Sequence, residues 1–307
     1  MGTYNIHAGH APYNTGAYGA VGILNESNEV RKVKDTLITM LKNTGNTVYD
    51  CTCDMAYTQD EVLKYIVNLC NQHTVDLDIS IHLNSGRNDY TGDGSTGGVE
   101  VYIYDDSTRE ISEKICKYIS EYLGIRNRGV KVNKDLYVLK NTKNKAILIE
   151  CCFADDKDDA DKWDTNICAT AITRALINED ELQLHYRGHV QGTGWDKVKA
   201  TGEMAGTTGQ SKRLEAVKID YPGHLIYAKA HVQGIGDVDY GLINSDTVIG
   251  TTGQSKRLEA LWLKGDIKAR VHIQNKGWTD WVDMREGVWV GTKGQSLRLE
   301  AVEIERI

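Results

Sequence analysis

The chain has 307 residues, of which 40% are hydrophobic and 26% charged, and this is ordinary for a globular protein with room for two domains. No apolar run approaches the ~20 residues of a membrane span, which argues against membrane insertion. Residues 1–181 carry a net charge of −9 and residues 182–307 one of +2, which together give the −7 of the whole chain. So small a positive charge, without an Arg-rich segment, argues against a nucleic-acid partner.

The first predicted strand begins at residue 3 and leaves no room for a signal peptide, so we expect the protein to start in the cytoplasm. Its seven cysteines all lie between Cys51 and Cys168, and their odd number argues against a disulfide framework. Neither Cys51 with Cys53 nor Cys151 with Cys152 has the spacing of a thiolate zinc site. We therefore expect reduced cysteines that pack in the interior.

Strands and amphipathic helices alternate over the first part of the chain. Thr3–His10 is predicted to be a strand, and a glycine-rich loop follows it as far as Gly22. Asn25–Asn43 is predicted to be a helix, with Asn25 as its N-cap. Further strands are expected at Thr47–Cys51, Asp76–His82, Val99–Tyr104, Leu136–Leu139 and Ile147–Ile149, and further helices at Asp60–His73, Ser107–Leu123 and Trp163–Ile177. This alternation predicts an α/β domain with a mostly parallel sheet flanked by helices.

Three of these strands end in residues that can do chemistry. The first ends at His10, the strand from Asp76 ends at His82, and the apolar run of Lys145–Phe153 reaches Glu150. Ligands of open α/β sheets bind at the carboxyl ends of the strands, so the three side chains are expected to converge. A single histidine after a strand is more often a structural residue, but two histidines and a glutamate together indicate a site.

Two histidines and one carboxylate, with an open coordination position, are a ligand set of catalytic zinc. Such an ion polarises a carbonyl and lowers the pKa of its water towards ~7, which suits hydrolysis. The third ligand could be Glu26 or Glu29, because both lie at the start of the predicted helix. Glu150 would then be left as a general base that can afterwards protonate a leaving amine.

Six motifs follow one another in this half of the chain: IHAGH with GAYG, GILNE, SIHLN, GGVEVYIY, NRGVK with LYVLKNT, and AILIECCF. Through them, residues 3–178 resemble the zinc-dependent N-acetylmuramoyl-L-alanine amidases of the Amidase_3 type, which cleave peptidoglycan between muramic acid and L-alanine. Cys152 departs from the family, which commonly has a small residue after E-C, and this difference concerns only the local packing.

The resemblance implies a role for each residue of the expected site. His10, Glu26 and His82 would hold the zinc ion, and Glu150 would be the catalytic carboxylate. The resemblance also selects Glu26 over Glu29, because the ligand of the family lies where an L-x-E step enters the helix. Without the resemblance, Glu26 could simply be a carboxylate favoured at a helix N-terminus, and Glu150 a buried ion-pair partner.

Beyond residue 178 the chain repeats itself. GTTGQSKRLEA occurs at Gly206–Ala216 and Gly250–Ala260, and it returns as GTKGQSLRLEA at Gly291–Ala301. A second motif keeps the same spacing around histidines 189, 231 and 272. Three short β units of this period predict an all-β domain closed around a pseudo-threefold axis, β-prism-like or trefoil-like, because three repeats can share one core and leave no open edge. We place this domain at 182–307 and its repeats at about 186–219, 228–263 and 269–304.

H-V-Q-x-x-G-W followed by G-T-T-G-Q-S-x-R-L-E-A is similar to the clostridial hydrophobic (ChW) repeats of surface and wall-lytic proteins, which are associated with binding to cell-wall material. The resemblance makes four tryptophans candidate wall-binding residues: Trp195, Trp278, Trp281 and Trp289. Each of them could equally be a core residue. Arg213–Glu215, Arg257–Glu259 and Arg298–Glu300 could be packing or cross-strand features rather than ligand contacts. Asp237 replaces the tryptophan of the second repeat, so this copy is expected to bind more weakly.

Together the halves predict a zinc-dependent amidase at 1–178 with a wall-binding domain at 182–307, whose partners are peptidoglycan and associated wall polymers. The missing signal peptide favours a phage endolysin for a clostridial host, held in the host cytoplasm until its release to the cell wall. One alternative is a bacterial autolysin or germination amidase whose signal has been trimmed. Another is a non-catalytic wall-binding protein, against which the four intact site residues argue.

Overall fold

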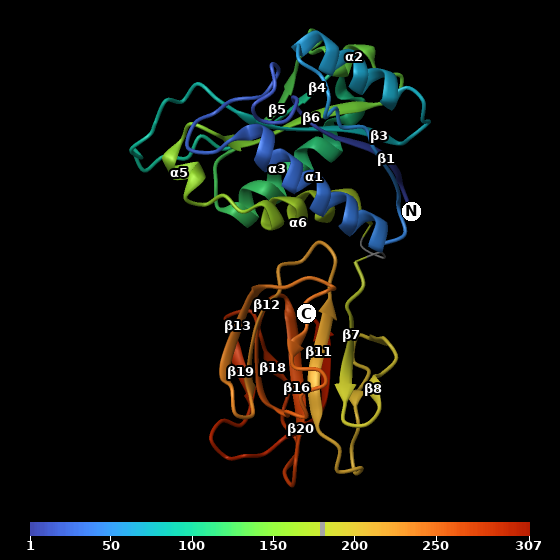
Figure 1. Ribbon diagram of the computed structural model, residues 1–307, viewed down its shortest axis with the longest axis vertical. Coiled ribbons are helices and arrows are strands. Elements are labelled where there is room, and N and C mark those ends of the chain that lie inside the picture. The colour runs from blue at the N-terminus through green and yellow to red at the C-terminus, as the bar shows by residue number, and fades with distance from the viewer. Residues whose placement is uncertain (179–181) are drawn as a thin grey trace. The chain divides into compact units, whose positions relative to one another are not determined.

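The computed structural model describes residues 1–178 and 182–307. The chain divides into two compact units, Met1–Glu181 and Leu182–Ile307 (Figure 1). Within the described ranges no helix is both long enough and apolar enough to cross a membrane. All seven cysteines are buried and free, as the sequence predicts.

The first unit is built on a six-stranded sheet. Its strands are β1 (Thr3–Ala8), β2 (Thr47–Asp50), β3 (Leu77–Asn84), β4 (Val99–Ile103), β5 (Asn127–Val132) and β6 (Ala146–Phe153). They lie in the order β2-β1-β3-β6-β4-β5, and all neighbours are parallel except β4 with β6. The predicted α/β fold with a mostly parallel sheet is confirmed, and the one antiparallel pair makes the sheet mixed.

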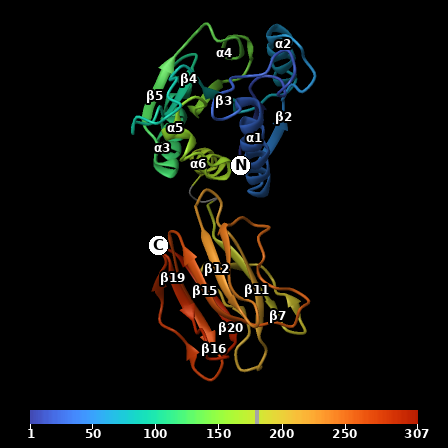
Figure 2. The ribbon, with the colours of Figure 1, turned by 60° about the vertical axis from the view of Figure 1, so that its left-hand side comes forward.

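Helices cover both faces of this sheet. They are α1 (Glu26–Asn43), α2 (Gln59–Cys70), α3 (Arg109–Leu123), α4 (Tyr137–Asn141), α5 (Lys157–Ala160) and α6 (Thr165–Leu176), with a short 3-10 turn η1 (Asp106–Thr108) before α3. Helices α1, α3 and α6 pack together on one face, and α2 and α4 lie on the other (Figure 1, Figure 2).

The ends of these helices follow the local sequence signals. Asn25 caps α1 as predicted, since its side chain accepts a hydrogen bond from the Asn28 amide. Gly124 ends α3 in the left-handed region, with φ 68°, which glycine adopts without steric cost. These caps fix where the buried helix faces meet the sheet.

The structure corrects one element and adds another. The strand predicted over Leu136–Leu139 is wrong, because the segment begins helix α4, where Val138 and Leu139 are buried. A run of four apolar residues fits a buried strand or a helical turn equally well, so its pattern could not decide between them. Strand β5 escapes prediction because its residues are half-buried without alternation.

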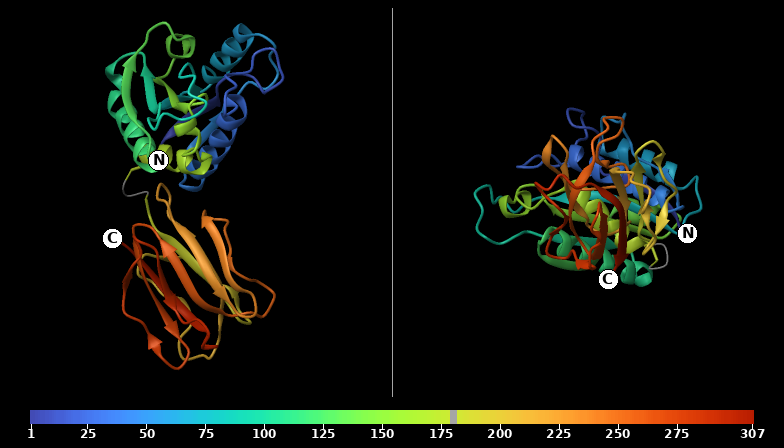
Figure 3. Two further views of the ribbon diagram at one scale, coloured as in Figure 1. Left: turned by 90° about the vertical axis from the view of Figure 1, so that its left-hand side faces the viewer. Right: turned by 90° about the horizontal axis from the view of Figure 1, so that it is seen from below.

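The second unit contains three antiparallel sheets. Its strands are β7 (His185–Val190), β8 (Gly194–Trp195), β9 (Lys199–Ala200), β10 (Ala205–Gly206), β11 (Leu214–Asp220), β12 (Tyr227–Val232), β13 (Gly236–Leu242), β14 (Ile249–Gly250), β15 (Leu258–Lys264), β16 (Ile267–Ile273), β17 (Gly277–Trp278), β18 (Val282–Asp283), β19 (Val288–Gly291) and β20 (Leu299–Arg306). The sheets run β14-β11-β7-β8, β13-β12-β15-β19 and β10-β20-β16-β17, with β9 added to the first and β18 to the third (Figure 1, Figure 3).

The three repeats close into a ring by exchanging one strand. The glycine-containing strand of each repeat pairs with the L-E-A strand of the repeat before it: β14 with β11, β19 with β15, and β10 with β20. Residues of all three sheets form one hydrophobic cluster, which includes Leu214, Leu258 and Leu299 at equivalent positions. Three sheets around one core correspond to the prism-like form of the predicted all-β domain.

The glycine that opens each G-T-x-G-Q-S motif is required by this exchange. At Gly206, Gly250 and Gly291 φ is 105°, 116° and 114°, a region that residues with a side chain rarely adopt. A Cβ at any of the three would also overlap a backbone carbonyl oxygen of the partner strand. The positive φ and the close partner strand therefore explain why all three repeats have glycine at this position.

Candidate active site

Strand β1 delivers His10 to the edge of the sheet through Gly9. The Gly9 amide donates to the carbonyl of Ile81 on β3 at 2.8 Å, which ties the two strand ends together. A Cβ at Gly9 would overlap the imidazole of His82, so glycine leaves the space that this ring occupies. His10 follows with φ 62°, and its ring meets that of His82 edge-on with centroids 5.0 Å apart.

Glu26, the first residue of α1, lies between the two imidazoles. Its Oε1 is 3.0 Å from His82 Nδ1 and 3.4 Å from His10 Nε2. The Leu83 amide donates to the same oxygen, and the Ala20 amide donates to Oε2. Burial by itself raises the pKa of Glu26, but the hydrogen bonds with His10 and His82 outweigh it, so the pKa lies well below its usual value. Glu26 is therefore a carboxylate at neutral pH.

Glu29, the other candidate from the sequence, points elsewhere. Its Oε2 accepts a hydrogen bond from Trp163 Nε1 at 3.0 Å, and its Oε1 pairs with Lys32 Nζ at 2.6 Å. The structure brings together His10, Glu26 and His82 and leaves Glu29 outside the group.

These three side chains fit a metal ion. One donor atom from each of His10, Glu26 and His82 lies within 4.8 Å of the others. Two imidazoles and a carboxylate are ligands that zinc prefers, and a set of three leaves a position open for water or substrate. The chemistry of the donor set thus agrees with the ion expected from the sequence.

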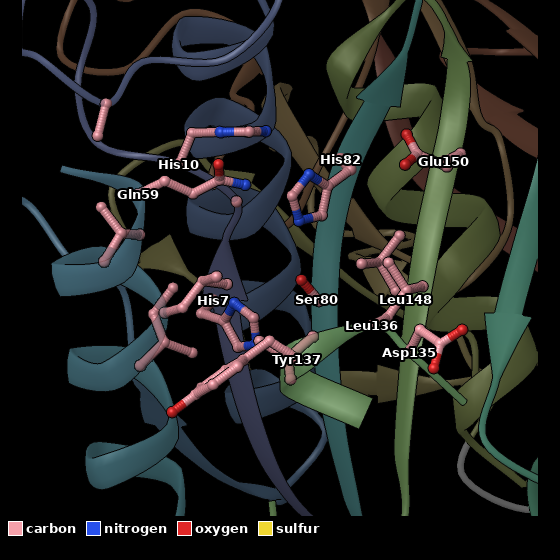
Figure 4. Close-up of a pocket in the computed structure, with 16 residues that line it drawn as sticks. His7, His10, Gln59, Ser80, His82, Asp135, Leu136, Tyr137, Leu148 and Glu150 are labelled. Atoms are coloured by element: carbon pink, nitrogen blue, oxygen red, sulfur yellow. The ribbon is translucent and has the colours of Figure 1, made fainter. Parts of the chain in front are cut away.

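Glu150 lies beside this group on strand β6. The sheet pairs it with His82 of β3, and Figure 4 shows the two side chains on adjacent strands. Its Oε2 is buried and has no hydrogen-bond partner, and no described cation forms an ion pair with it. Burial, followed by the charges of Glu26 and Glu100, raises the pKa of Glu150 well above its usual value. The contacts do not support the alternative role of a structural ion-pair partner.

A pocket of about 400 Å³ opens onto these residues (Figure 4). His10, His82 and Glu150 line it together with residues of α2 and α4, among them Val62 and Val138. An apolar wall facing a few convergent polar groups is the usual form of a small-molecule or substrate site.

Two titratable residues near the site were not predicted from the sequence. His7 lines the pocket on β1, its Nδ1 has no partner, and burial followed by the charge of His82 lowers its pKa to about 3. Glu100 of β4 is paired with Glu150 across the sheet and bonds to Arg128 and Lys131. The only sequence signal for either was a polar residue within an apolar strand.

The four candidate tryptophans of the second unit are half-buried and stand outside its hydrophobic cluster. Each has a cation over its ring; Arg270, for example, lies 5.0 Å from the Trp278 centroid and 4.8 Å from that of Trp281. A core role for Trp195, Trp278, Trp281 or Trp289 is therefore not supported by the packing.

The Arg-x-Glu pairs of the repeats are internal contacts. Glu215 is 5% exposed, accepts a hydrogen bond from Arg213 Nε at 2.8 Å and lies 3.1 Å from His189 Nδ1. The arginine–glutamate pair recurs in the other repeats, as Arg257–Glu259 and Arg298–Glu300. In the second repeat the histidine pairs with Asp237 instead of the glutamate. His231 Nδ1 lies 2.6 Å from Asp237 Oδ1, whereas His231 Nε2 lies 3.9 Å from Glu259 Oε2.

Family models match both units. The model described as N-acetylmuramoyl-L-alanine amidase, Amidase_3, matches residues 5–178, which is more than half of the chain. The chain belongs to this amidase family. The model described as clostridial hydrophobic W matches the chain at 189–223, 231–264 and 272–306.

Similar proteins include proteins of clostridia and bacilli and an endolysin that targets Clostridia Difficile. An uncharacterized 38.4 kDa protein of Clostridium perfringens is 34% identical over 65% of this chain and 60% of its own length. The N-acetylmuramoyl-L-alanine amidase LytC of Bacillus subtilis is 30% identical over 60% of this chain and 36% of its own length. The catalytic domain of the CD27L endolysin targeting Clostridia Difficile superposes with a TM-score of 0.51 and 28% identity, over 58% of this chain and all of that domain. The chain thus spans less than two thirds of the length of these two curated relatives.

Proposed function

We propose that this protein is a zinc-dependent peptidoglycan hydrolase that cleaves the amide bond between N-acetylmuramic acid and L-alanine. The observation that carries the proposal is the convergence of His10, Glu26 and His82 next to Glu150, whose buried Oε2 has no partner, in one pocket. This arrangement stands in a chain of the amidase family, and its residues match the roles that the sequence motifs imply.

His10, Glu26 and His82 would hold the zinc ion, which would polarise the scissile carbonyl and make a water molecule more acidic. Glu150 then accepts a proton from the attacking water at Oε2, while the oxygen of that water bonds to the carbonyl carbon. When the C–N bond breaks, Glu150 returns the proton to the nitrogen of L-alanine. The products are the lactyl carboxylate of the sugar and a free stem peptide.

We propose further that the enzyme is a phage endolysin, held in the host cytoplasm until it reaches the wall of a clostridial cell. The likeness to the catalytic domain of an endolysin that targets Clostridia Difficile and the three ChW repeats support this. The likeness to LytC supports the second candidate, a bacterial autolysin or germination amidase. The intact His10, Glu26, His82 and Glu150 argue against a non-catalytic wall-binding protein.

The test is digestion of a soluble muropeptide by the purified protein, with its zinc content measured on the same sample. We expect one zinc per chain and a new N-terminal L-alanine among the products, identified by mass spectrometry. Cleavage within the glycan or within the peptide, or turnover that survives complete zinc removal, would contradict the proposed reaction.

A further inference from the structure

The first repeat differs from its two relatives at one cross-strand position on the outer face of its sheet. This position lies two residues before the repeat histidine on one strand and faces the L-E-A strand. The matching pairs in repeats one, two and three are Arg187 with Lys218, Lys229 with Trp262, and Arg270 with Glu303. In the first repeat alone, two cations face each other.

The second and third repeats neutralise the cation at this position. Arg270 Nη2 lies 2.6 Å from Glu303 Oε2, directly across the strands. Lys229 Nζ lies 2.7 Å from Asp239 Oδ2 and 5.2 Å from the centroid of the Trp262 ring. The position therefore tolerates a cation when a carboxylate accompanies it.

The first repeat supplies no such partner. Within the described residues no carboxylate oxygen lies within 4.0 Å of the Arg187 guanidinium, and the only one at that distance from Lys218 Nζ belongs to Asp246, whose side chain is 89% exposed. Asp220 lies two residues beyond Lys218, at the next pair on the same face, opposite His185, and no ion pair joins it to Arg187 or Lys218 among the described residues. Like charges directly opposite on a sheet destabilise it, so this pair is unfavourable by itself.

Trp195 holds both cations in place. Arg187 Cζ lies 5.0 Å and Lys218 Nζ 5.9 Å from the centroid of its ring. An indole ring attracts cations but carries no charge, so it orients the two side chains without neutralising them. Both cations line a pocket of about 260 Å³ on this face, together with His185, Val198, Asp220 and Ser245, so that two cations and a histidine accompany one carboxylate there.

We propose that the first repeat binds an oxyanion of a wall polymer between Arg187 and Lys218, beside Trp195. A guanidinium fork and an ammonium group can bind different oxygens of one phosphate or carboxylate group, and the anion removes the repulsion between them. This inference adds a binding site to the wall anchoring proposed above, and it rests on that proposal only for the source of the anion. The source is either a phosphodiester polymer attached to the wall or the carboxylates of peptidoglycan.

The test uses Lys218→Glu, which copies the Arg270–Glu303 pair of the third repeat into the first. The fold should tolerate this variant, and its Tm should be unchanged or higher. Lys264→Glu is the matched control, because it changes the charge by the same amount at an exposed residue of the second repeat. Both are made in full-length protein that carries Glu150→Gln, so that walls are not digested during a pelleting assay.

We expect Lys218→Glu to weaken binding to walls by about tenfold or more, which corresponds to 1.4 kcal/mol, and Lys264→Glu to change it by less than about twofold. Binding of the parent should also fall as salt concentration rises. Equal binding by Lys218→Glu and Lys264→Glu would overturn the proposal. Treating the walls with hydrofluoric acid identifies the source: the difference between the variants disappears if the anion is a phosphodiester and persists if it is a peptidoglycan carboxylate.

Inorganic phosphate gives a measurement that needs no wall. The indole N–H signal of Trp195 should shift saturably on phosphate addition in the parent and stay unchanged in Lys218→Glu, and a parent signal that does not move would overturn the site. Turnover of soluble muropeptide by the protein with intact Glu150 is measured separately. A protein without turnover that still shows the binding difference would refute the proposed amidase activity and leave the anion site standing.

Discussion

Glu26 and Glu29 lie within one helical turn of each other, yet only Glu26 faces the two histidines. The first turn of α1 directs Glu26 towards the sheet, where the amides of Ala20 and Leu83 hold its carboxylate. Glu29 instead accepts a hydrogen bond from Trp163, which lies just before α6. Two side chains that are three residues apart lie on the same side of a helix, yet they can contact different residues.

This difference predicts which glutamate holds the metal. Glu26→Ala should purify with less than a tenth of the zinc of the parent, because a third ligand is lost and metal affinity depends on the full set. Glu29→Ala is the matched control and should keep its zinc, with a stability loss of about 1 kcal/mol for its hydrogen bond to Trp163. Zinc per chain is measured on protein whose circular dichroism matches that of the parent. Retention of zinc by Glu26→Ala would show that the ligand set is wrong.

Glu150→Gln should keep both the fold and the zinc and lose ~10²–10⁴ in turnover of soluble muropeptide. The amide has nearly the same shape as the carboxylate but cannot take up a proton from water or return it to the amine. The comparison is made at one pH with the parent and the variant at equal zinc content. Near-normal turnover by Glu150→Gln would assign Glu150 a structural role instead.

In the second unit, the pairing of strands from different repeats requires a glycine at one position of each repeat. The first glycine of each G-T-x-G-Q-S motif ends a two- to four-residue strand, which pairs with the L-E-A strand of another repeat. The backbone of Gly250 must approach Glu215 and Ala216 so closely that no Cβ fits. The ring is therefore closed by short strands whose pairing depends on single glycines.

Gly250→Ala should lower the free energy of unfolding of the second unit by about 3 kcal/mol or more, because it combines an unfavourable φ with a backbone overlap. Gly253→Ala is the control: its φ is 71°, but a Cβ there meets nothing within 4 Å, so only the conformational cost of about 1–2 kcal/mol is expected. Calorimetry of the full chain measures both. Equal losses for the two variants would mean that the overlap at Gly250 relaxes without cost.

At the scale of the whole molecule, the two units have separate cores and separate chemistry. Residues 1–178 contain the complete candidate metal site, and residues 182–307 contain all three repeats with their shared core. A tethered binding unit raises the local concentration of an enzyme on an insoluble polymer by ~10²–10⁴ without altering the reaction.

We therefore expect residues 1–178 alone to cleave soluble muropeptide as fast as the full chain and to lyse whole walls at least ~10²-fold more slowly. Residues 182–307 alone should fold without metal and pellet with clostridial walls. Trp195→Ala and Trp278→Ala should weaken this binding more than Asp237→Ala, because Asp237 already replaces the tryptophan of its repeat. If residues 182–307 fold but stay in the supernatant with every wall preparation, the repeats do not anchor the enzyme.

Much of this protein can be predicted from its sequence because the strongest signals in the sequence are local. Caps such as Asn25, the alternation of strands and helices, and the three repeated motifs each lie within a few residues, and the fold class and the amidase family follow from them. The histidines at the ends of β1 and β3 could be found in the same way. A short apolar run such as Leu136–Leu139 carries no period, so there the sequence predicted the wrong element.

Contacts between distant segments could not be predicted in this way, and the tertiary structure was needed to find them. It paired β4 with β6 in antiparallel register, which puts Glu100 opposite Glu150. It also set Arg187 opposite Lys218, which no local pattern reveals, because the register of two strands 31 residues apart is fixed by the shared core. Local propensities select the elements, whereas burial of a common core selects which of their side chains meet.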